Sequence, residues 1–563
     1  MAPITGGSFL TEERSLKEAF TPEDLGEEER AIARTADEFW AQEAVPRLDA
    51  IEHQEPGVAL ALLRKSAELG LTAISIPEQY GGLELGLPAA LVADEHLAGS
   101  GSYANWHGAH TGIGTLPLVY FGTEEQKRKY LPKLARVELL AAYALTEPQA
   151  GSDALAAHTR ADLSADGTHY ILNGQKMWIT NGGSADLFTV FAKVNGEQFT
   201  AFLVERAFGG VTSGSEERKM GMKGSSTTAI YFDNVPVPAS NVLGEVGRGH
   251  KIAFNILNIG RLKLGPFALG GAKMVLAASL RYAKQRVAFG SPIAEFGAIR
   301  HKLAEMAIRM YAAESAVWRV VGLIGQRVSL EALEEFAVEC SIVKVFASEM
   351  LDYVADEGVQ IHGGYGYHQD YAVERAYRDS RINRIFEGTN EINRLLISGM
   401  LLKRAARGKL PLVAAVQSVM AEMLSAPSSS AGNPGEQLVR SARKITLLVM
   451  GAAYRRYAAE LEKQQELLMA IADMAMETFI MESVFLRARK TGQGDVPCAV
   501  YLPDALARVE IAARTALAAC AEGDELRTLL AGLRRFARYE PVNTIALRQT
   551  LAARLLAAER YVA

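Results

Sequence analysis

Residues 170–180 read YILNGQKMWIT, in which two short runs of β-forming residues flank the dipeptide Asn173-Gly174. An Asn-Gly pair between such runs is the strongest short-range signal for a β-hairpin with a two-residue type I′ turn. Three further β-rich runs follow, namely LFTVFAKV (187–194), FTAFLVE (199–205) and TTAIYF (227–232). We therefore predict a compact sheet or barrel within residues 143–245.

Helical patterns lie on both sides of this β segment. On its N-terminal side, Thr21-Pro22-Glu23 predicts an N-cap and a helix start, and residues 123–126 (TEEQ) fit a capping box. Between them, SIPEQYGG (75–82) is typical of a loop. On its C-terminal side, long amphipathic stretches run from Lys251 to about Ala406. This α–β–α order differs from alternating βα units, and no GxGxxG follows a strand, so a Rossmann nucleotide site is not indicated.

The last part of the chain is predicted to be a helical extension. The segment SAPSSSAGNPGEQ (425–437) has the Ser, Pro and Gly content of a linker, and helices rich in Ala, Leu and Arg follow it. We therefore predict a multi-domain α+β fold. Its four domains are an N-terminal helical domain (1–142), a middle β domain (143–245), a helical bundle domain (246–406) and an additional helical domain (407–563).

Composition and charge limit the class of protein. The 563 residues are 49% hydrophobic and 22% charged, as in a globular protein with a large buried core. The formal net charge of −5 does not favour nucleic acid, and we expect no nucleic-acid partner. Residues 401–563 hold 22 Lys+Arg and 16 Asp+Glu, a local charge of +6, so residues 1–400 carry −5 − 6 = −11. This basic extension leaves a peripheral contact with anionic lipid open, although solvated helix faces explain the charge better.

Cysteine use and the start of the chain bear on its location. Cys340, Cys498 and Cys520 are far apart, with no CxxC and no histidine at metal-ligand spacing, so we expect a reducing compartment and no metal site. The start MAPITGGSFLTEERSLKEAF lacks the basic and apolar regions of a signal peptide, and its glutamates argue against a transit peptide. No apolar run approaches the roughly 18 residues of a membrane span. We expect a cytoplasmic bacterial protein, with a processed organelle protein as the alternative.

Four short segments carry side chains that suit a bound cofactor. YALTEPQAGSD (143–153) offers hydroxyls and close backbone approach to a polar edge or a phosphate, and in WITNGG (178–183) the Trp can pack on a planar ring beside the Thr hydroxyl. In RVAFG (286–290) the Arg can fork onto a diphosphate, and the paired glycines of QIHGGYGY (360–367) let a ligand come close. Each segment has a structural alternative: respectively a strand and turn, a core Trp at a hairpin turn, a charge at a helix C-terminus, and a helix C-cap.

Taken in this order within an α–β–α frame, the four segments resemble the acyl-CoA dehydrogenase family. YALTEPQAGSD and the run from QIHGGYGY to RDSRINRIFEGTNEI (360–392) are similar to its two signature segments. The resemblance covers residues 20–405. With FNILNIGR (254–261) and the helical extension, the very-long-chain branch is the most similar. The resemblance implies FAD as the cofactor, an acyl-CoA substrate, a homodimer, and electron-transferring flavoprotein as a partner.

The resemblance also implies roles for residues at matching positions. The FAD-binding set is Tyr143, Leu145, Thr146, Gly151, Ser152, Trp178, Thr180, Arg286, Phe289, Gln360, Gly363, Gly364, Thr389 and Glu391. Within it, Trp178 and Thr180 are expected against the isoalloxazine ring, and Arg286 with Phe289 is expected to reach the FAD of the neighbouring subunit. The substrate set is Ser152, Asn258, Arg261, Phe386 and Gly388. Gly297 departs from the Gln of many relatives, as it does in the very-long-chain branch.

Glu387, in IFEGTN (385–390), falls on the family's catalytic base. Some relatives place the base just before the Arg that here is Arg261, but Gly260 in that position cannot serve. A solvated Glu has a pKa near about 4.3 and is a feeble base. Desolvation between two apolar neighbours and an acyl chain should raise its pKa toward about 6–7. The alternative is an exposed loop Glu.

The implied reaction is the FAD-dependent α,β-dehydrogenation of a long-chain acyl-CoA to trans-2-enoyl-CoA in fatty acid β-oxidation. Glu387 takes the α-proton, flavin N5 accepts the β-hydride, and the N–H of Glu387 with an FAD hydroxyl stabilises the enolate-like oxygen. Gly108, Gly112 and Gly114 are expected to open the acyl tunnel for long chains, unless they serve helix packing. The alternatives are an oxidase that uses O₂, a dehydrogenase for branched or other acyl groups, a non-enzymatic assembly factor of a respiratory complex, and a nucleic-acid-associated relative.

Overall fold

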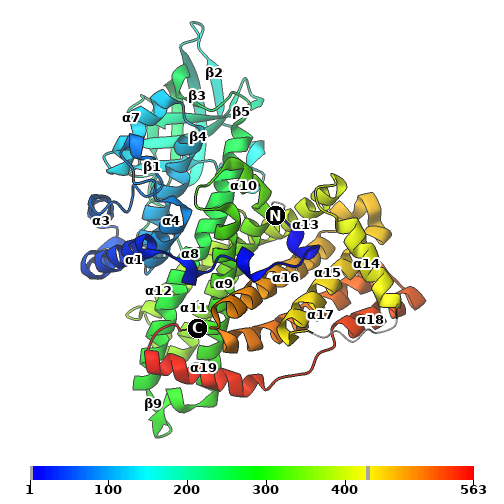
Figure 1. The fold of residues 1–563 in the computed structure, drawn as a ribbon. Helices are drawn as coiled ribbons and strands as arrows, with labels where there is room; N and C mark the ends of the chain where they lie inside the picture. Colours follow the sequence, from blue (N-terminus) through cyan, green and yellow to red (C-terminus); the bar gives the residue numbers. More distant parts are fainter. Residues whose placement is uncertain (1–3, 426–431, 563) are drawn as a thin grey trace.

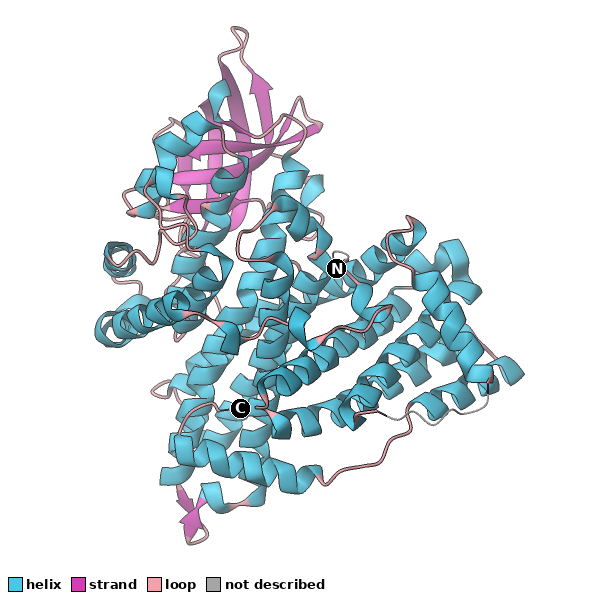
Figure 2. Cartoon of the chain, viewed as in Figure 1, coloured by secondary structure: helices cyan, strands magenta, loops and turns pink. Residues whose placement is uncertain are grey.

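The chain forms a mainly helical body with a β-sheet at one end (Figures 1 and 2). The computed structural model describes residues 4–425 and 432–562. Helices come first, then the sheet, then two further groups of helices, which confirms the predicted α+β class with its helical extension. No helix in these ranges is long and apolar enough to cross a membrane.

The N-terminal helices are α1 (Glu27–Phe39), α2 (Leu48–Glu52), α3 (Val58–Glu68), α4 (Gly86–His96), α5 (Gly101–Gly108), α6 (Leu116–Phe121) and α7 (Glu124–Ala135). The predicted capping box starts α7. The Thr123 hydroxyl accepts from the N–H of Gln126 at 3.2 Å, and the Gln126 side chain accepts from the N–H of Thr123 at 3.0 Å. The helix start predicted at Thr21 is wrong, because Thr21 caps a single 3₁₀ turn and α1 begins only after Gly26. The predicted loop 75–82 is confirmed, and one 3₁₀ turn (Glu78–Tyr80) lies inside it.

An eight-stranded sheet follows within the described chain, in the order β6-β7-β3-β2-β4-β5-β8 with β1 beside β4. The strands are β1 (Ala141–Ala144), β2 (Arg160–Leu163), β3 (His169–Thr180), β4 (Leu187–Val194), β5 (Gln198–Glu205), β6 (Val211–Ser213), β7 (Thr227–Pro238) and β8 (Val242–Leu243). β4 and β5 are buried along nearly their whole length, as their continuous apolar sequences require. The three β-rich runs predicted after the Asn-Gly pair lie within β4, β5 and β7 and are confirmed as strands.

The predicted hairpin at Asn173-Gly174 does not form. β3 runs straight through both residues, with Asn173 opposite Arg160 of β2 and Gly174 opposite Phe232 of β7. The register shifts at Gly174, whose φ is 147°, and a Cβ there would lie 2.8 Å from the Cα of Thr159. The glycine thus forms a β-bulge and lets the backbone of Thr159 approach closely. Its antiparallel partner β7 comes from far along the sequence.

The helical body consists of α8 (Gly249–Gln285), α9 (Gly297–Ile324), α10 (Leu330–Glu335), α11 (Ala337–His362), α12 (Ala372–Ser380) and α13 (Asn390–Ala406). A two-stranded hairpin, β9 (Val287–Ala288) and β10 (Ser291–Pro292), joins α8 to α9. Gly265 lets the long helices approach closely, because a Cβ there would lie 2.6 Å from Val317 and 2.9 Å from Val343. The predicted helix ends are confirmed: Arg286 is the C-cap of α8, and Gly363 ends α11.

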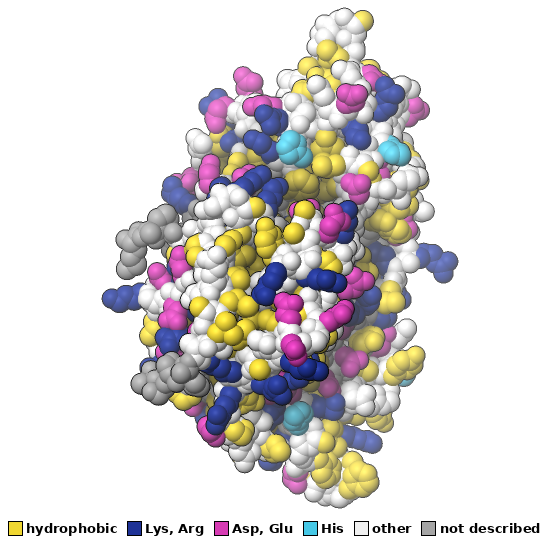
Figure 3. Space-filling view, turned by 90° about the vertical axis from the view of Figure 1, so that its right-hand side faces the viewer, with side chains coloured by type: hydrophobic (Ala, Val, Ile, Leu, Met, Phe, Trp, Pro, Cys, Tyr) yellow, Lys and Arg dark blue, Asp and Glu magenta, His cyan; other side chains and the backbone are white. Residues whose placement is uncertain are grey.

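The extension consists of α14 (Leu412–Leu424), α15 (Pro434–Tyr457), α16 (Gln465–Thr491), α17 (Asp495–Cys520), α18 (Gly523–Phe536) and α19 (Thr544–Ala558). α16 packs on α9 and α13, and α19 returns to lie across the lower end of the helical body near β9 (Figure 1). Of the predicted linker 425–437, residues 426–431 lie outside the described residues, and α15 already begins at Pro434. On the outer face, Lys and Arg are mixed with Asp and Glu (Figure 3), as on ordinary solvated helices.

Candidate active site

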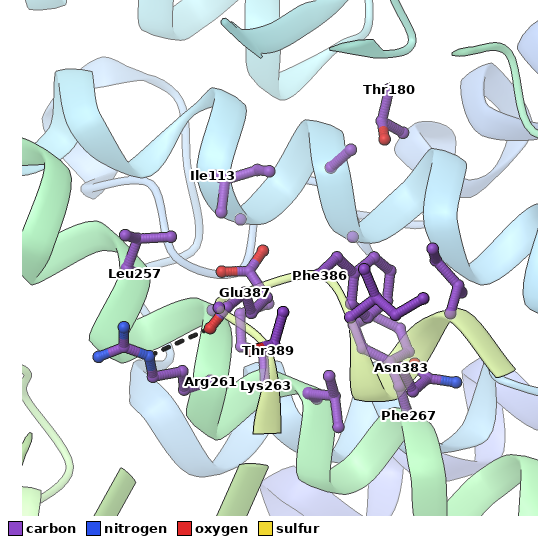
Figure 4. A pocket seen from close by; sticks show the side chains of 18 of the residues that line it. Ile113, Thr180, Leu257, Arg261, Lys263, Phe267, Asn383, Phe386, Glu387 and Thr389 are labelled. Carbon is purple, nitrogen blue, oxygen red and sulfur yellow. Dashed lines mark hydrogen bonds between the residues drawn. The ribbon is translucent and has the colours of Figure 1, made fainter. Parts of the chain in front are cut away.

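A cavity of about 1800 Å³ lies where the N-terminal helices, the sheet and the helical body meet (Figure 4). It gathers most of the predicted site residues: Tyr143, Leu145, Thr146, Gly151, Ser152, Trp178, Thr180, Asn258, Arg261, Phe386, Glu387, Gly388 and Thr389. The predicted residues that do not line it are Arg286, Phe289, Gln360, Gly363, Gly364 and Glu391. Segments far apart in sequence therefore converge on one chamber, with Glu387 in its wall.

The loop that carries Glu387 has an unusual backbone. Glu387 has φ of 57° and Gly388 has φ of 81°, so two successive residues are left-handed just before α13. A non-glycine residue in this region is strained, and such strain persists where the surrounding structure fixes it. The conformation turns the Glu387 carboxylate away from its own loop and into the cavity (Figure 4). Gly388 takes its share of the turn without a Cβ penalty.

Buried donors hold the carbonyl groups of this loop. Nε of Arg261 donates to the carbonyl of Glu387 at 3.2 Å (Figure 4), and Asn258 accepts from the other end of the Arg261 guanidinium at 2.9 Å. Nδ2 of Asn393 donates to the carbonyl of Gly388 at 2.8 Å. Asn258 and Arg261, predicted as substrate contacts, therefore also anchor the loop from α8. Satisfying these buried carbonyls keeps the strained turn in place.

Gly260 lies directly against the Glu387 carboxylate. A Cβ at position 260 would be 2.5 Å from Oε2 of Glu387 and 2.9 Å from its Cδ. No side chain fits there without displacing the carboxylate, so a base on α8 and a base at Glu387 exclude one another sterically. This is the physical reason that glycine at position 260 accompanies glutamate at position 387.

The electrostatics of Glu387 suit a base. Its Oε2 is buried and has no hydrogen-bond partner among the described residues. Burial raises the pKa of Glu387 to about 7, although Arg261 and Lys344 act in the opposite direction. The exposed-loop alternative is thus wrong. The nearby Tyr143 is also buried, and burial together with the Glu387 charge raises the pKa of its hydroxyl well above the usual value.

Trp178 provides a planar surface in the wall of the cavity. It sits at a second register shift of β3, with φ of 60°, and its side chain is 54% exposed. The core-Trp alternative is therefore wrong, because the indole faces the cavity and not the interior of the sheet. Next to it, Gly151 has open space where a Cβ would be, and Ser152 and Thr180 supply hydroxyls. A half-exposed indole, an open glycine and hydroxyls in a chamber of this size fit a planar cofactor such as FAD.

The remaining FAD-set residues form a second cluster at the opposite end of α8. Phe289, at the tip of the β9–β10 hairpin, has φ of 52° and is 99% exposed. The Arg286 guanidinium lies 5.7 Å from the ring of Tyr365, beside Gly363 and Gly364, where a Cβ would meet open space. Exposed aromatic and cationic groups next to bare backbone are what a neighbouring subunit and its cofactor would contact. Gln360 lies in the same stretch.

Two predicted residues lie elsewhere. Glu391 is exposed in the first turn of α13, between Thr389 and Ile392, which line the cavity. Gly297 begins α9, and the side chain of Gln549 from α19 donates to its carbonyl at 3.4 Å. A glutamine from the extension thus lies next to Gly297.

One face of α8 runs along the cavity beyond Glu387. Its lining residues recur at helical spacing: Gly260, Lys263, Leu264, Phe267, Gly271 and Met274. The opposite wall comes from α5 and the π turn that follows it, including Gly108 and Gly112. A Cβ at Gly108 would lie 2.7 Å from the ring of Phe267, so the glycine keeps this passage open. Gly114 does not line the cavity. It packs on Ala141, so the helix-packing alternative holds for that residue.

The sequence analysis missed the residues that hold the loop from α11 and α13, chiefly Lys344, Asn390 and Asn393. Lys344 stands alone in the apolar run SIVKVFA (341–347), which is a signal for a buried, functionally placed charge. The two asparagines gave no comparable signal. Nothing in their local pattern distinguishes a side chain that folds back on its own loop from one that faces solvent.

Comparisons with known proteins agree on one family. Models of the acyl-CoA dehydrogenase N-terminal, middle and C-terminal domains match residues 26–138, 142–235 and 247–402, and a second C-terminal domain model matches residues 441–535. A "probable acyl-CoA dehydrogenase" of Bacillus subtilis (strain 168) is 46% identical over 99% of this chain and 98% of its own. A crystal structure of acyl-CoA dehydrogenase complexed with FAD from Bacillus anthracis, 46% identical, matches with a TM-score of 0.97 over 100% of both chains. The very long-chain specific acyl-CoA dehydrogenase of Rattus norvegicus is 44% identical over 59% of this chain and 51% of its own.

Proposed function

Because the chain belongs to the acyl-CoA dehydrogenase family, whose members are FAD-dependent oxidoreductases that act on a CH–CH bond, we propose that it oxidises long-chain acyl-CoA thioesters. The reaction belongs to fatty acid β-oxidation, and Glu387 serves as its base. The observation that carries the proposal is the buried carboxylate of Glu387, aimed into the head of a long cavity. The product is the trans-2-enoyl-CoA.

The residues of this chain account for the proton-transfer half of the reaction. Glu387 removes the α-proton, and its raised pKa of about 7 brings the base near the working pH, where proton transfer is most effective. The N–H of Glu387 makes no hydrogen bond to a described residue and can donate to the enolate-like oxygen. Arg261 holds the Glu387 carbonyl, which fixes the peptide that follows Glu387 and so limits rotation of the residue that carries this N–H. When bound, FAD supplies the acceptor for the two electrons that leave Cβ, and Trp178, Thr180, Thr146 and Ser152 would hold it.

The length of the cavity supports long acyl chains. From Gly260, beside the base, to Met274 the lining face of α8 spans 14 residues, which is about 21 Å at a rise of about 1.5 Å per residue. An extended chain advances roughly 1.2 Å per bond, so the 14 bonds from C2 to C16 need roughly 17 Å. A palmitoyl chain therefore fits this face, and Gly108 and Gly112 leave room for it on the opposite wall.

The mouth of the cavity supports a CoA thioester. Lys403, Arg407 and Lys409, at the C-terminal end of α13, line it and are exposed. Among residues 4–425 and 432–562, none of the three is in an ion pair. Lys403 and Arg407 are four residues apart and share one helix face. Such cations suit the phosphates of CoA, whereas an acyl chain alone would need none.

The exposed cluster around Arg286 and Phe289 supports a homodimer in which the hairpin of one subunit reaches the FAD of the other. Electrons then leave for an electron-transferring flavoprotein, as the family resemblance implies. Sedimentation and cross-linking at position 289 would test the dimer, since the proposal requires the hairpin to lie at the interface.

The chain-length proposal is tested by steady-state kinetics with C4, C8, C16 and C20 acyl-CoA substrates and a flavoprotein acceptor. We expect kcat/KM to be highest at C16 or above. Comparable turnover of C4 and C16, or a clear C4 preference, would contradict the proposal. A branched acyl-CoA of equal length serves as the comparison for the alternative substrate class.

A further inference from the structure

Lys344 of α11 is a fully buried lysine directed at the Glu387 loop. Its side chain is 0% exposed. Nζ donates to the carbonyl of Gly388 at 2.8 Å and to Oδ1 of Asn390 at 2.6 Å. It therefore contacts the same turn as Arg261, which donates to the carbonyl of Glu387 at 3.2 Å. Two cations from two helices thus fix two successive carbonyl groups.

The second partner of Lys344 extends the support into α11. Asn390 opens α13, and its Nδ2 donates to the Ser348 hydroxyl and to a Glu349 carboxylate oxygen, each at 3.0 Å. Lys344 and Ser348 are four residues apart on one face of α11, so both meet the start of α13. The loop cannot shift without breaking several buried hydrogen bonds together.

The charge of Lys344 has no ordinary structural explanation. Within the described chain, no carboxylate lies within ion-pair distance of Nζ. Burial lowers the pKa of Lys344 to about 7, which reflects the cost of keeping the ammonium charged there. A neutral amide could donate to the same two acceptors without that cost. A lysine placed here at this cost, where an amide would serve the same acceptors, points to a function.

The charged groups that face Lys344 indicate what the function is. Glu387, Glu349 and Glu391 attract its ammonium, and Arg261 from α8 repels it. Glu349 is already bound by Arg394 at 2.7 Å, and Glu391 is exposed, whereas Glu387 is half-buried and its Oε2 is buried and unpartnered within the described chain. The reciprocal influence is present, since Lys344 and Arg261 both favour the charged form of Glu387. From β1, Tyr143 faces the same carboxylate with a neutral hydroxyl.

We propose that Lys344 is a positioning residue for the reaction: it fixes the Gly388 peptide so that Glu387 faces the substrate, and it adds a cation next to the Glu387 loop. This inference rests on the proposed role of Glu387 as the base. Lys344 does not line the cavity, so it acts through the loop and through the field at the carboxylate.

Two variants separate the two contributions. Lys344→Gln keeps a donor for the loop but loses the charge, and Lys344→Met loses both. In the Gln variant we expect the acidic limb of the kcat/KM profile with palmitoyl-CoA to move up by about one pH unit, since removing a nearby cation disfavours the carboxylate. In the Met variant we expect the same movement and a fall in plateau kcat of about 10- to 10²-fold, because a base displaced by a fraction of an ångström loses its geometry.

The control is Lys302→Met, which removes a partly buried lysine that pairs with Glu357 of the same helix α11, away from the cavity. It should leave the pH profile in place, even where the thermal midpoint falls. A wild-type acidic limb in both Lys344 variants would overturn the inference. If the Met variant does not fold, the Gln variant alone decides the role of the charge. An inactive wild type would refute the proposed function itself, which is a distinguishable result.

Discussion

At the scale of the residue, the account depends on a carboxylate that is strained, desolvated and sterically protected. Glu387 occupies a left-handed conformation next to Gly388, with one oxygen buried and unpartnered. Gly260 leaves the space that the Glu387 carboxylate fills. Each feature is costly for a structural residue, and together they are typical of a functional site.

The pH dependence of catalysis should report the pKa of Glu387. Burial raises this pKa to about 7, so the carboxylate forms as the pH rises through 7. We expect kcat/KM for palmitoyl-CoA to increase over this window and to level off above it. An acidic limb near 4.5, the ordinary value for Glu, would show that the base is solvated.

The same shift has a consequence for stability. A carboxyl with a raised pKa favours the folded state below pH 4.5, and this contribution is lost as the pH rises through 7. Glu387→Gln removes the ionisation, so the variant should melt above wild type at pH 8 and together with it at pH 4. Thermal melts of both proteins at the two pH values measure this difference. Equal midpoints at pH 8 would contradict the desolvation of Glu387.

Gly260→Ala tests the steric protection of the base. The new Cβ would lie 2.5 Å from Oε2 of Glu387, so the carboxylate must move. We expect plateau kcat to fall by about 10²-fold, with the fold intact by circular dichroism. Gly399→Ala is the matched control, because this helical glycine of α13 has open space where its Cβ would be. A Gly260→Ala enzyme with wild-type kcat would refute the arrangement.

At the scale of the element, the sequence predicted the helical regions and the four longest strands, but not the short strands or how the strands pair. The capping box at Thr123 and the end of α8 at Arg286 are local signals, and both appear as predicted. Asn173-Gly174 carries an equally strong local signal for a turn, yet a long-range partner, β7, converts it to a bulge within β3. Local chemistry specifies that the backbone is unusual there. It does not specify which strand lies alongside.

The same limit applies to the site. The family resemblance predicted thirteen residues that line the cavity, because their roles depend on matching positions. Lys344 acts on Gly388 from 44 residues away, and that contact exists only once α11 and α13 pack together. No pattern along the chain encodes the distance between these two groups.

The tunnel between α5 and α8 should set the acyl-chain preference. In Gly108→Val the new side chain would meet the Phe267 ring, since even a Cβ would lie 2.7 Å from it. An acyl chain long enough to pass this point would then be overpacked, at a cost of roughly 1–3 kcal/mol. The kcat/KM for C16 acyl-CoA should therefore drop about tenfold or more, while the kcat/KM for C6 acyl-CoA should not change. The double variant with Phe267→Ala should recover C16 turnover. An unchanged C16 to C6 ratio in Gly108→Val would mean that the acyl chain takes another path.

At the scale of the whole molecule, the extension is joined to the body by buried charges. Glu314 of α9 lies 2.7 Å from Lys273 of α8 and 2.8 Å from Arg487 of α16, and it accepts from the hydroxyl of Tyr561 near the C-terminus at 3.1 Å. Arg487 also reaches Glu23 near the N-terminus at 2.6 Å. One carboxylate thus connects the helical body, the extension and both ends of the described chain.

Glu314→Gln should therefore destabilise the protein as a whole. It leaves the half-buried Lys273 and the buried Arg487 with one carboxylate fewer, and breaking a buried pair costs up to about 3–5 kcal/mol. The half-exposed pair of Glu422 with Lys444 is the control, and Glu422→Gln should cost about 1 kcal/mol or less. Denaturant unfolding of the three proteins measures this. A loss below about 1 kcal/mol for Glu314→Gln would contradict the role of the network.

The acid side of the stability curve follows from the same carboxylate. Burial alone would raise the pKa of Glu314, but Lys273 and Arg487 outweigh it and lower the pKa to about 2. The network therefore stabilises the fold above the ordinary value of 4.5, and this contribution is lost as the pH falls toward 2.

The central claim is that Glu387 is the base of an FAD-dependent acyl-CoA dehydrogenation. The most direct test is an anaerobic titration of the purified flavoprotein with palmitoyl-CoA, followed by its flavin absorbance, beside Glu387→Gln. We expect the flavin band to bleach in the wild type and to persist in the variant, with equal flavin content in both. Bleaching of the Glu387→Gln flavin at the wild-type rate would contradict it.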